Sequence, residues 1–325
     1  MQNEINTDIY ESPLITVITP AYNSEFIFES ISSVLNQTYE RIQYIIIDDG
    51  SRQFDESMVR TFIEKNKKSN LVDYIVIQNQ NNIGTVKTLN IGLKLAIGKY
   101  IFNLAADDIF YDKEVLREWV VEFRTRNSHI LTGIRAVYDS TLTCLEGMLP
   151  TADEIKLLES ENPKKIFEKL LKANFIFGCC TARSKQLVDE FGFYDEDYFL
   201  LEDYPSMLML SRNGVKIGFW NRPVVKYRLG GVSAPEKFNS TYEYDSDLVL
   251  EKEILPYIKH PFYAKILYTK WKFMQKEHGK FLRSYKQLKR KRQFYFVPFL
   301  CLRFPLQVLG SVKYKVKTIL KKILS

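Results

Sequence analysis

The sequence YIFNLAADD, residues 100–108, runs from a mostly apolar stretch directly into two adjacent acidic residues. Continuous apolar side chains that favour β-structure predict a strand covered on both faces of a sheet. Asp107 and Asp108 follow the C-terminal end of this strand, where open α/β sheets hold their ligands. Adjacent carboxylates repel each other, and their oxygens suit Mg²⁺ or Mn²⁺ that bridges a diphosphate. The alternative is that the pair caps the helix that begins near Lys113 or lies in a solvated turn.

Apolar strands and amphipathic helices alternate before this stretch. Strands are predicted at residues 14–19, 44–47, 73–77 and 100–104, and helices after Ser24, at residues 55–68 and around Leu89 and Leu93. Gly98 ends the last of these helices in front of the central strand. Such alternation predicts a parallel, doubly wound α/β sheet.

Polar side chains follow three of the predicted strands. They are Tyr22 and Asn23, Asp48 and Asp49, and Asp107 and Asp108. The C-terminal ends of parallel strands share one edge of the sheet, so a nucleotide-type site is favoured there, although loops are polar in general. The chain has no GxGxxG after its first strand and no GxxxxGKS/T, which argues against the usual dinucleotide and P-loop sites.

A second pair of acidic residues lies among aromatic and apolar neighbours. Glu202 and Asp203 follow the sequence FGFYDEDYFLL. Such surroundings raise the pKa of a carboxyl group toward the range that suits a general base. The alternative is that both residues belong to the acidic first turn of the helix predicted at residues 206–212.

The other segments of the second half carry weaker signals. Strands are predicted at residues 130–138 and 215–220, and residues 142–163 are expected to form an irregular, acidic loop with a short helix. Lys226 and Arg228 either reach a phosphate group or form a solvated basic edge.

Taken together, these motifs resemble, in order and spacing, those of the inverting glycosyltransferases of family 2, of the bacterial surface-polysaccharide type. The motifs are TPAYN, DDGS, NNIG with Asn90, AADD, the Glu202-Asp203 pair and Tyr227-Arg228, and they cover residues 14–234. The resemblance implies the GT-A fold. This fold is a doubly wound, mostly parallel sheet with a Rossmann-like nucleotide-binding half and an acceptor-binding half.

The resemblance implies a nucleotide-sugar site. Its residues are Pro20, Tyr22, Asn23, Asp49, Lys87, Asn90, Asp107 and Arg228. In the family, the residue at the position of Tyr22 stacks near the nucleotide base, and the one at Asp49 accepts a hydrogen bond from uracil. UDP is therefore the expected nucleotide.

The resemblance also implies a metal site and a base. Asp108 and Asp107 would hold Mn²⁺ or Mg²⁺, with Asp108 favoured for direct contact, and Asp203 would act as the base beside Glu202. Ala105 stands where many family members have a carboxylate, so the division of metal and ribose between Asp107 and Asp108 stays open.

The implied reaction is a single displacement that inverts the sugar. One hexose or N-acetylhexosamine would pass from the nucleotide to a growing glycan or a polyprenyl-diphosphate-linked acceptor in capsule or exopolysaccharide synthesis. The QxxRW signature of processive synthases is replaced by LMLSRNG, which indicates one sugar per encounter. The alternatives are a nucleotidyltransferase and an inactive sugar-nucleotide-binding scaffold.

Charge and composition predict where the protein works. The net charge is +7, and residues 280–325 contain 13 Lys and Arg but no Asp or Glu. Basic residues alternate there with apolar ones, which predicts attachment to an anionic membrane surface and no nucleic acid partner. Four cysteines without regular spacing, no signal-peptide pattern and no long apolar run predict a cytoplasmic protein on the inner face of the cell membrane.

These signals predict five segments. A polar leader, 1–12, precedes a GT-A domain, 13–235, whose nucleotide-sugar half is 13–110 and whose acceptor half is 111–235. A helical extension, 236–285, then leads into a basic amphipathic tail, 286–325.

Overall fold

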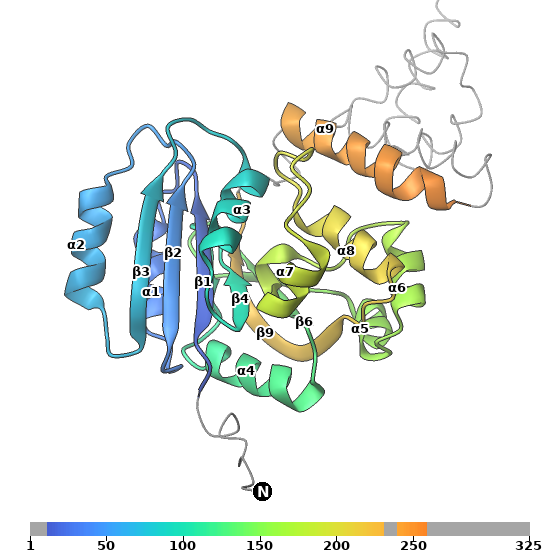
Figure 1. Ribbon diagram of the computed structural model, residues 1–325, viewed down its shortest axis with the longest axis horizontal. Helices are drawn as coiled ribbons and strands as arrows, with labels where there is room; N and C mark the ends of the chain where they lie inside the picture. The colour runs from blue at the N-terminus through green and yellow to red at the C-terminus, as the bar shows by residue number, and fades with distance from the viewer. Residues whose placement is uncertain (1–11, 231–238, 259–325) are drawn as a thin grey trace, which may run out of the picture. The chain divides into compact units, whose positions relative to one another are not determined.

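The computed structural model describes residues 12–230 and 239–258 (Figure 1). The chain divides into two compact units, Met1–Ala234 and Pro235–Ser325. The five predicted segment boundaries stay predictions, and the expected basic tail lies outside the described residues.

The first unit alternates strands and helices as the apolar pattern predicts. Its strands are β1 (Ile15–Ala21), β2 (Ile42–Asp48), β3 (Leu71–Gln78), β4 (Tyr100–Asn103), β5 (Ile109–Phe110), β6 (Ile130–Tyr138), β7 (Leu145–Leu149), β8 (Thr181–Ser184) and β9 (Gly218–Arg228). Its helices are α1 (Ile27–Leu35), α2 (Glu56–Asn66), α3 (Thr85–Leu95), α4 (Val115–Arg126), α5 (Ala152–Glu159), α6 (Pro163–Leu170), α7 (Lys185–Phe191) and α8 (Asp203–Arg212).

One mixed sheet runs through this unit in the order β3-β2-β1-β4-β8-β6-β9-β5, with β7 paired to β6. The first four strands of this order are parallel, so their C-terminal ends meet at one edge. Beyond them β8 pairs antiparallel to both β4 and β6, whereas β9 pairs parallel to β6. The parallel half therefore brings together the loops that follow β1, β2 and β4.

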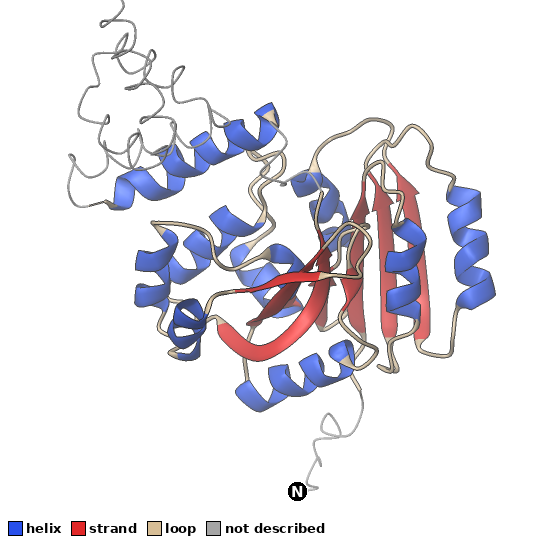
Figure 2. Ribbon diagram, turned by 180° about the vertical axis from the view of Figure 1, so that it is seen from behind, coloured by secondary structure: helices blue, strands red, loops and turns tan. Residues whose placement is uncertain are grey.

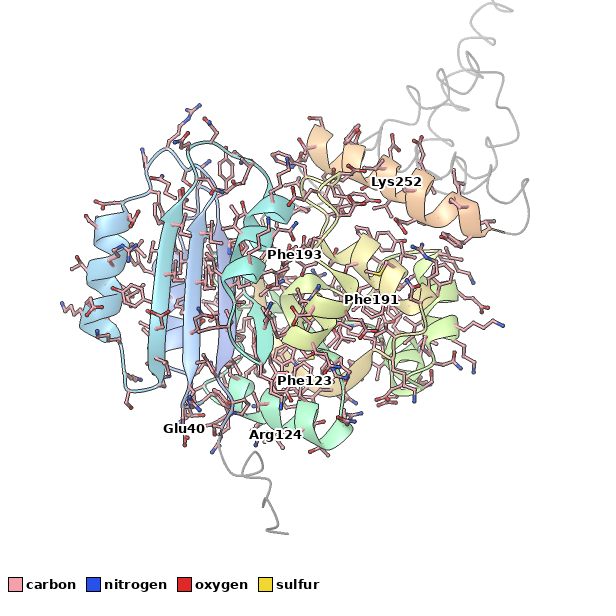
Figure 3. The ribbon with its side chains drawn as sticks, viewed as in Figure 1. Glu40, Phe123, Arg124, Phe191, Phe193 and Lys252 are labelled. Atoms are coloured by element: carbon pink, nitrogen blue, oxygen red, sulfur yellow. The ribbon has the colours of Figure 1, made fainter. Side chains whose placement is uncertain are left out.

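Helices cover both faces of the parallel half, which explains its unbroken apolar strands. Figure 1 shows α3 in front of the sheet, and the reverse view in Figure 2 shows α1 in front of it. Every residue of β2 is buried. Phe123 of α4, labelled in Figure 3, stacks on Tyr100 at a ring distance of 4.4 Å and lies in the same cluster as Trp119 and Phe102.

Two expectations about the second half were right in part. Residues 142–163 contain the expected short helix, α5, but they also form β7 and the start of α6 rather than an irregular loop. The strand expected at 215–220 is present as β9, but it runs from Gly218 to Arg228. Pro223 lies where the register between β9 and β6 shifts, and such irregular positions tolerate a residue without an N–H group.

The described part of the second unit begins with α9 (Ser240–Val249). The side chain of Asn239 caps this helix by accepting from the N–H groups of Thr241 and Tyr242. A π-helical turn, Leu250–Ile254, continues it. Within residues 12–230 and 239–258, no helix has the length and apolar character that a membrane span needs.

Candidate active site

The DDGS motif forms a tight turn at the end of β2. The Asp48 carboxylate accepts hydrogen bonds from the N–H and the hydroxyl of Ser51, at 2.8 and 2.5 Å. Gly50 has φ +75°, and a Cβ at this position would lie 2.5 Å from the carbonyl carbon of Asn81. Only glycine fits this backbone and this close approach, so the turn fixes the position of the next loop.

Asp49 holds the NNIG loop at the start of α3. Its carboxylate accepts from the Asn79 amide at 3.0 Å and from the N–H groups of Ile83 and Gly84, both at 2.9 Å. A carboxylate offers about four lone-pair sites, so these three bonds leave room for about one more donor. Asp49 is thus mainly a loop anchor, and its expected bond to uracil stays a prediction.

The TPAYN motif ends β1 beside the same turn. Tyr22 is 49% exposed, and this exposure leaves its ring accessible to a stacking partner. Asn23 has φ 48°, and its N–H donates to the Ser51 hydroxyl at 2.6 Å. The carbonyl of Pro20 accepts from the N–H of Ala106 at 3.2 Å. These bonds join the loops after β1, β2 and β4.

The side-chain amide of Asn90 is already hydrogen-bonded within the protein. It is 1% exposed, and its amide nitrogen donates to the Tyr194 carbonyl at 2.9 Å and to the Glu196 carboxylate at 3.1 Å. Its amide oxygen accepts from the N–H of Tyr194 at 3.0 Å. The expected contact of Asn90 with the nucleotide sugar is therefore corrected, because both donors bind residues 194–196. Lys87, on the same helix, is exposed.

Serine hydroxyls of the α1 region fix the AADD loop after β4. Ser30 donates to the Ala105 carbonyl at 3.2 Å, and Ser24 donates to the Ala106 carbonyl at 2.9 Å. The N–H of Asp108 donates to the same Ala105 carbonyl at 3.0 Å. The loop consequently presents its two carboxylates in a fixed order, with Asp107 partly exposed and Asp108 buried.

The carboxylate pair fits a divalent cation. One oxygen of Asp108 accepts from the N–H of Arg228 at 2.9 Å, whereas Oδ2 is buried and has no hydrogen-bond partner. Burial, and then the neighbouring Asp107 charge, raise the pKa of Asp108 well above its usual value. Burial also raises the pKa of Asp107. A cation would favour the ionised form of both groups.

The pair does not form a complete protein cage. Within residues 12–230 and 239–258, no group of three or more His, Cys, Asp or Glu side chains is placed to hold a metal ion. A cation at Asp107 and Asp108 would thus take its other ligands from water or from a phosphate-bearing ligand, as Mg²⁺ commonly does.

Arg228 supports the AADD loop through hydrogen bonds from its buried side chain. It is 3% exposed, and its guanidinium donates to the carbonyls of Asp107 and Ser140 at 2.9 and 2.6 Å and pairs with Glu29 at 2.7 Å. Neither expectation for Arg228, a phosphate contact or a solvated basic edge, matches this arrangement, because every nitrogen has a protein acceptor. Lys226 lies 5.6 Å from the ring of Tyr138.

Asp203 is the first residue of α8 and is held by three donors. Its Oδ2 accepts from the N–H of Gly178 at 3.0 Å and from the Asn174 amide at 3.3 Å, and its Oδ1 accepts from the N–H of Tyr204 at 2.6 Å. Loss of solvent through burial outweighs these bonds and raises the pKa of Asp203 above the usual value of an aspartate. The direction of this shift is the one expected for a general base, and the role of Asp203 as the base stays a prediction.

Glu202 packs against Gly178. A Cβ on Gly178 would lie 2.5 Å from Oε1 of Glu202 and 3.3 Å from Cβ of Asp203. The short helical turn Gly178–Cys180 therefore approaches both acidic residues closely, and a side chain at position 178 would displace the Glu202 carboxylate.

Arg135 of β6 lies close to both acidic centres. Its guanidinium stacks between the rings of Phe177 and Tyr227, at 3.7 and 4.4 Å from their centroids. Its positive charge acts to lower the pKa of both Asp108 and Asp203. Its Nε atom is buried without a hydrogen-bond partner. Arg135 thus links the acidic pair after β4 to the acid at the start of α8.

Sequence reasoning missed Arg135, Asn174 and Gly178. For Arg135 a signal was present, since it is the one charged residue in the otherwise apolar strand ILTGIRAVY. A charged residue within a strand that is otherwise buried is uncommon, because arginine is mostly exposed unless it is paired. Asn174 and Gly178 gave no comparable signal, because their importance depends on the distant Asp203.

Comparison with known proteins identifies relatives of this arrangement. The family model described as "Glycosyl transferase family 2" matches residues 16–192. An "Uncharacterized glycosyltransferase" from Haemophilus influenzae is 30% identical over 260 residues, which cover 76% of this chain and 75% of the relative.

Two solved structures share the fold. The mannosyltransferase PcManGT from Pyrobaculum calidifontis, in complex with GDP-Man and Mn²⁺, has a TM-score of 0.59 at 16% identity and covers 93% of this chain and 84% of its own. TarS 1–349 from S. aureus, in complex with UDP-GlcNAc, has a TM-score of 0.53 at 18% identity, with coverages of 80% and 72%.

Proposed function

The chain belongs to glycosyl transferase family 2 and is a glycosyltransferase with the GT-A fold. On this premise we propose that it transfers one sugar per encounter from a UDP-sugar and inverts the configuration at the anomeric carbon. The observation that carries the proposal is that Arg135 lies close enough to two acidic centres, Asp108 with Asp107 and Asp203, to act on the pKa of Asp108 and of Asp203. A metal-assisted leaving group and a base need this arrangement of two separate carboxylate sites.

The donor is proposed to be a nucleotide sugar bound across the loops after β1, β2 and β4. Structural neighbours hold UDP-GlcNAc and GDP-Man, which supports this class of donor. The exposed ring of Tyr22 offers a stacking surface for the base, and Asp49 retains capacity for about one further donor. UDP, with a hexose or N-acetylhexosamine, remains our proposed donor.

Asp107 is proposed as the carboxylate that contacts Mn²⁺ or Mg²⁺ directly. This revises the preference for Asp108, since Asp108 is 1% exposed and already accepts from Arg228, whereas Asp107 is partly exposed. Asp108 would support the cation through its Oδ2 atom, which is buried without a hydrogen-bond partner. When bound, the cation neutralises charge on the departing diphosphate.

Asp203 is proposed as the general base. It would remove the proton from the acceptor hydroxyl as that oxygen attacks the anomeric carbon from the face opposite the diphosphate. One displacement would convert an α-linked nucleotide sugar into a β-glycoside. The N–H of Gly178 and the Asn174 amide would orient the carboxylate during this step.

The acceptor is proposed to be a polyprenyl-diphosphate-linked or growing glycan in the synthesis of a cell-surface polysaccharide. The alternation of basic and apolar residues in 286–325 supports attachment to the inner face of the membrane. Truncation before Lys286 should release the protein from anionic vesicles and leave activity on a soluble acceptor analogue unchanged. Continued sedimentation with vesicles in high salt would contradict this part of the proposal.

A panel of nucleotide sugars, each incubated with Mn²⁺, tests the function itself. We expect release of a nucleoside diphosphate and a product of inverted configuration. Release of pyrophosphate would instead identify a nucleotidyltransferase. Binding of a nucleotide sugar without any turnover, in the presence of candidate acceptors, would indicate an inactive scaffold.

A further inference from the structure

Arg135 is a cation whose hydrogen-bonding capacity is not used by the described protein. Its guanidinium is held face-on by Phe177 and Tyr227, and none of its nitrogens donates to a side chain or carbonyl of residues 12–230 and 239–258. Arg228, by contrast, donates hydrogen bonds to Glu29, Asp107 and Ser140. Stacking fixes the guanidinium plane and leaves its edge, where the N–H groups point, as the binding surface.

Two acids lie close to Arg135 without pairing to it. Phe177 precedes Gly178, whose N–H donates to Asp203, and Tyr227 precedes Arg228, whose N–H donates to Asp108. Arg135 acts to lower the pKa of Asp108 and of Asp203, yet it forms no ion pair with either residue. Its position therefore suits an oxygen-rich anion that binds between the two carboxylates. Planar forks of this kind match phosphate oxygens closely.

The surrounding charge decides which anion fits. The ionised forms of Asp107, Asp108 and Asp203 would repel a free phosphate or carboxylate, and none of these residues offers it a positive charge. An anion that arrives with a divalent cation avoids this cost, because the cation neutralises the Asp107 and Asp108 pair. A metal-bound diphosphate has this property, whereas an anionic group on the acceptor does not.

We propose that Arg135 binds the sugar-proximal phosphate of the metal-bound donor diphosphate and retains it as the leaving group departs. This inference rests on the proposed function, since it takes a nucleoside diphosphate as the ligand. It places a second positive group, in addition to the cation, beside the bond that breaks. Arg135 would then stabilise the charge that develops on the departing oxygen.

Calorimetric binding of UDP and UMP to the full chain, with and without Mn²⁺, tests the proposal. Arg135→Gln should weaken Mn²⁺-dependent UDP binding about 10- to 100-fold, the worth of charge-assisted hydrogen bonds, and should change UMP binding less than about twofold. Without Mn²⁺, the wild-type and variant affinities for UDP should agree within about twofold, because the acids then repel the diphosphate.

Arg60→Gln is the matched control. Arg60 also lies over an aromatic ring, at 6.0 Å from the centroid of Tyr74, but it is on α2 and pairs with Glu56. Its loss should leave all four affinities unchanged. If Arg135→Gln does not fold, Arg135→Lys keeps the charge and loses the fork, and it should weaken Mn²⁺-dependent UDP binding by about threefold or more.

The outcomes separate the two proposals. If the wild type binds neither UDP nor GDP in Mn²⁺, the proposed function fails and the role of Arg135 fails with it. If the wild type binds UDP and the Arg135 variants bind it equally well, only the inference is overturned. A raised KM for the acceptor with unchanged UDP affinity would also overturn it and place Arg135 on the acceptor side.

Discussion

Replacing Asp203 with Asn separates the chemical role of this residue from its structural role. The Asp203 carboxylate accepts from the N–H groups of Gly178 and Tyr204 and from the Asn174 amide. An Asn amide has only one acceptor oxygen. Whichever way it points, its NH₂ group must face at least one of these donors, and an unsatisfied buried donor costs about 1–3 kcal/mol. Asp203→Asn should therefore lower the free energy of unfolding by about this amount.

The same change should remove the base. Loss of a positioned general base costs about 100- to 10,000-fold in the chemical step, while donor affinity should stay within about twofold of the wild type. Single-turnover kinetics with saturating donor, together with calorimetric donor binding, measures the two effects separately. Asn174→Ala is the matched control, because it removes one donor to Asp203 and keeps the carboxylate. Lost donor affinity with an intact chemical rate would refute the assignment of Asp203 as the base.

Three further predictions concern the acidic groups. Asp107→Asn should raise the Mn²⁺ concentration needed for half-maximal donor binding more than Asp108→Asn does, because an Asn oxygen at position 108 can still accept from the Arg228 N–H; the reverse order in a Mn²⁺ titration would contradict this. Since a base works only when deprotonated and burial raises the pKa of Asp203, the acidic limb of kcat/KM should lie at a higher pH than an unperturbed aspartate would give, and it should disappear in Asp203→Asn; a limb that Asp203→Asn leaves unchanged would exclude Asp203. Gly178→Ala should lower kcat with little change in donor affinity, because its methyl group would lie 2.5 Å from Oε1 of Glu202; an unchanged kcat would show that this approach is not needed.

The parallel half of the sheet could be predicted from sequence because its signals are local. Buried strands such as β2 are apolar at nearly every position, and the acidic residues that end β2 and β4 share an edge through parallel pairing. Asp48, Asp49, Asp107 and Asp108 were therefore placed at the correct edge. Their individual partners were not predictable, since Asp49 binds a loop about thirty residues away.

The other half depends on contacts between distant segments. β8 pairs with β4 through Phe102 and Ala182, and this pairing brings the Gly178–Cys180 turn to the acidic loop. No local pattern predicts such an insertion of an antiparallel strand. Arg228 shows the same limit, because its residue type suggested phosphate binding while its partners, such as Glu29, are set by the fold. Tertiary context thus decided between the alternatives that the sequence left open.

The bonds between α3 and residues 194–199 have a consequence for building hybrid enzymes. Asn90 binds Tyr194 and Glu196, and the Phe199 carbonyl accepts from the N–H of Val86 at 3.2 Å. Gly84 leaves no space for a side chain beneath Phe199, where a Cβ would lie 2.5 Å from that carbonyl oxygen. A crossover between residues 110 and 111, the predicted boundary between the nucleotide-sugar half and the acceptor half, would separate these interlocked surfaces. A hybrid that exchanges donor preference between relatives should thus take both the N-terminal fragment and residues 194–199 from the same parent, and a single crossover should not be enough.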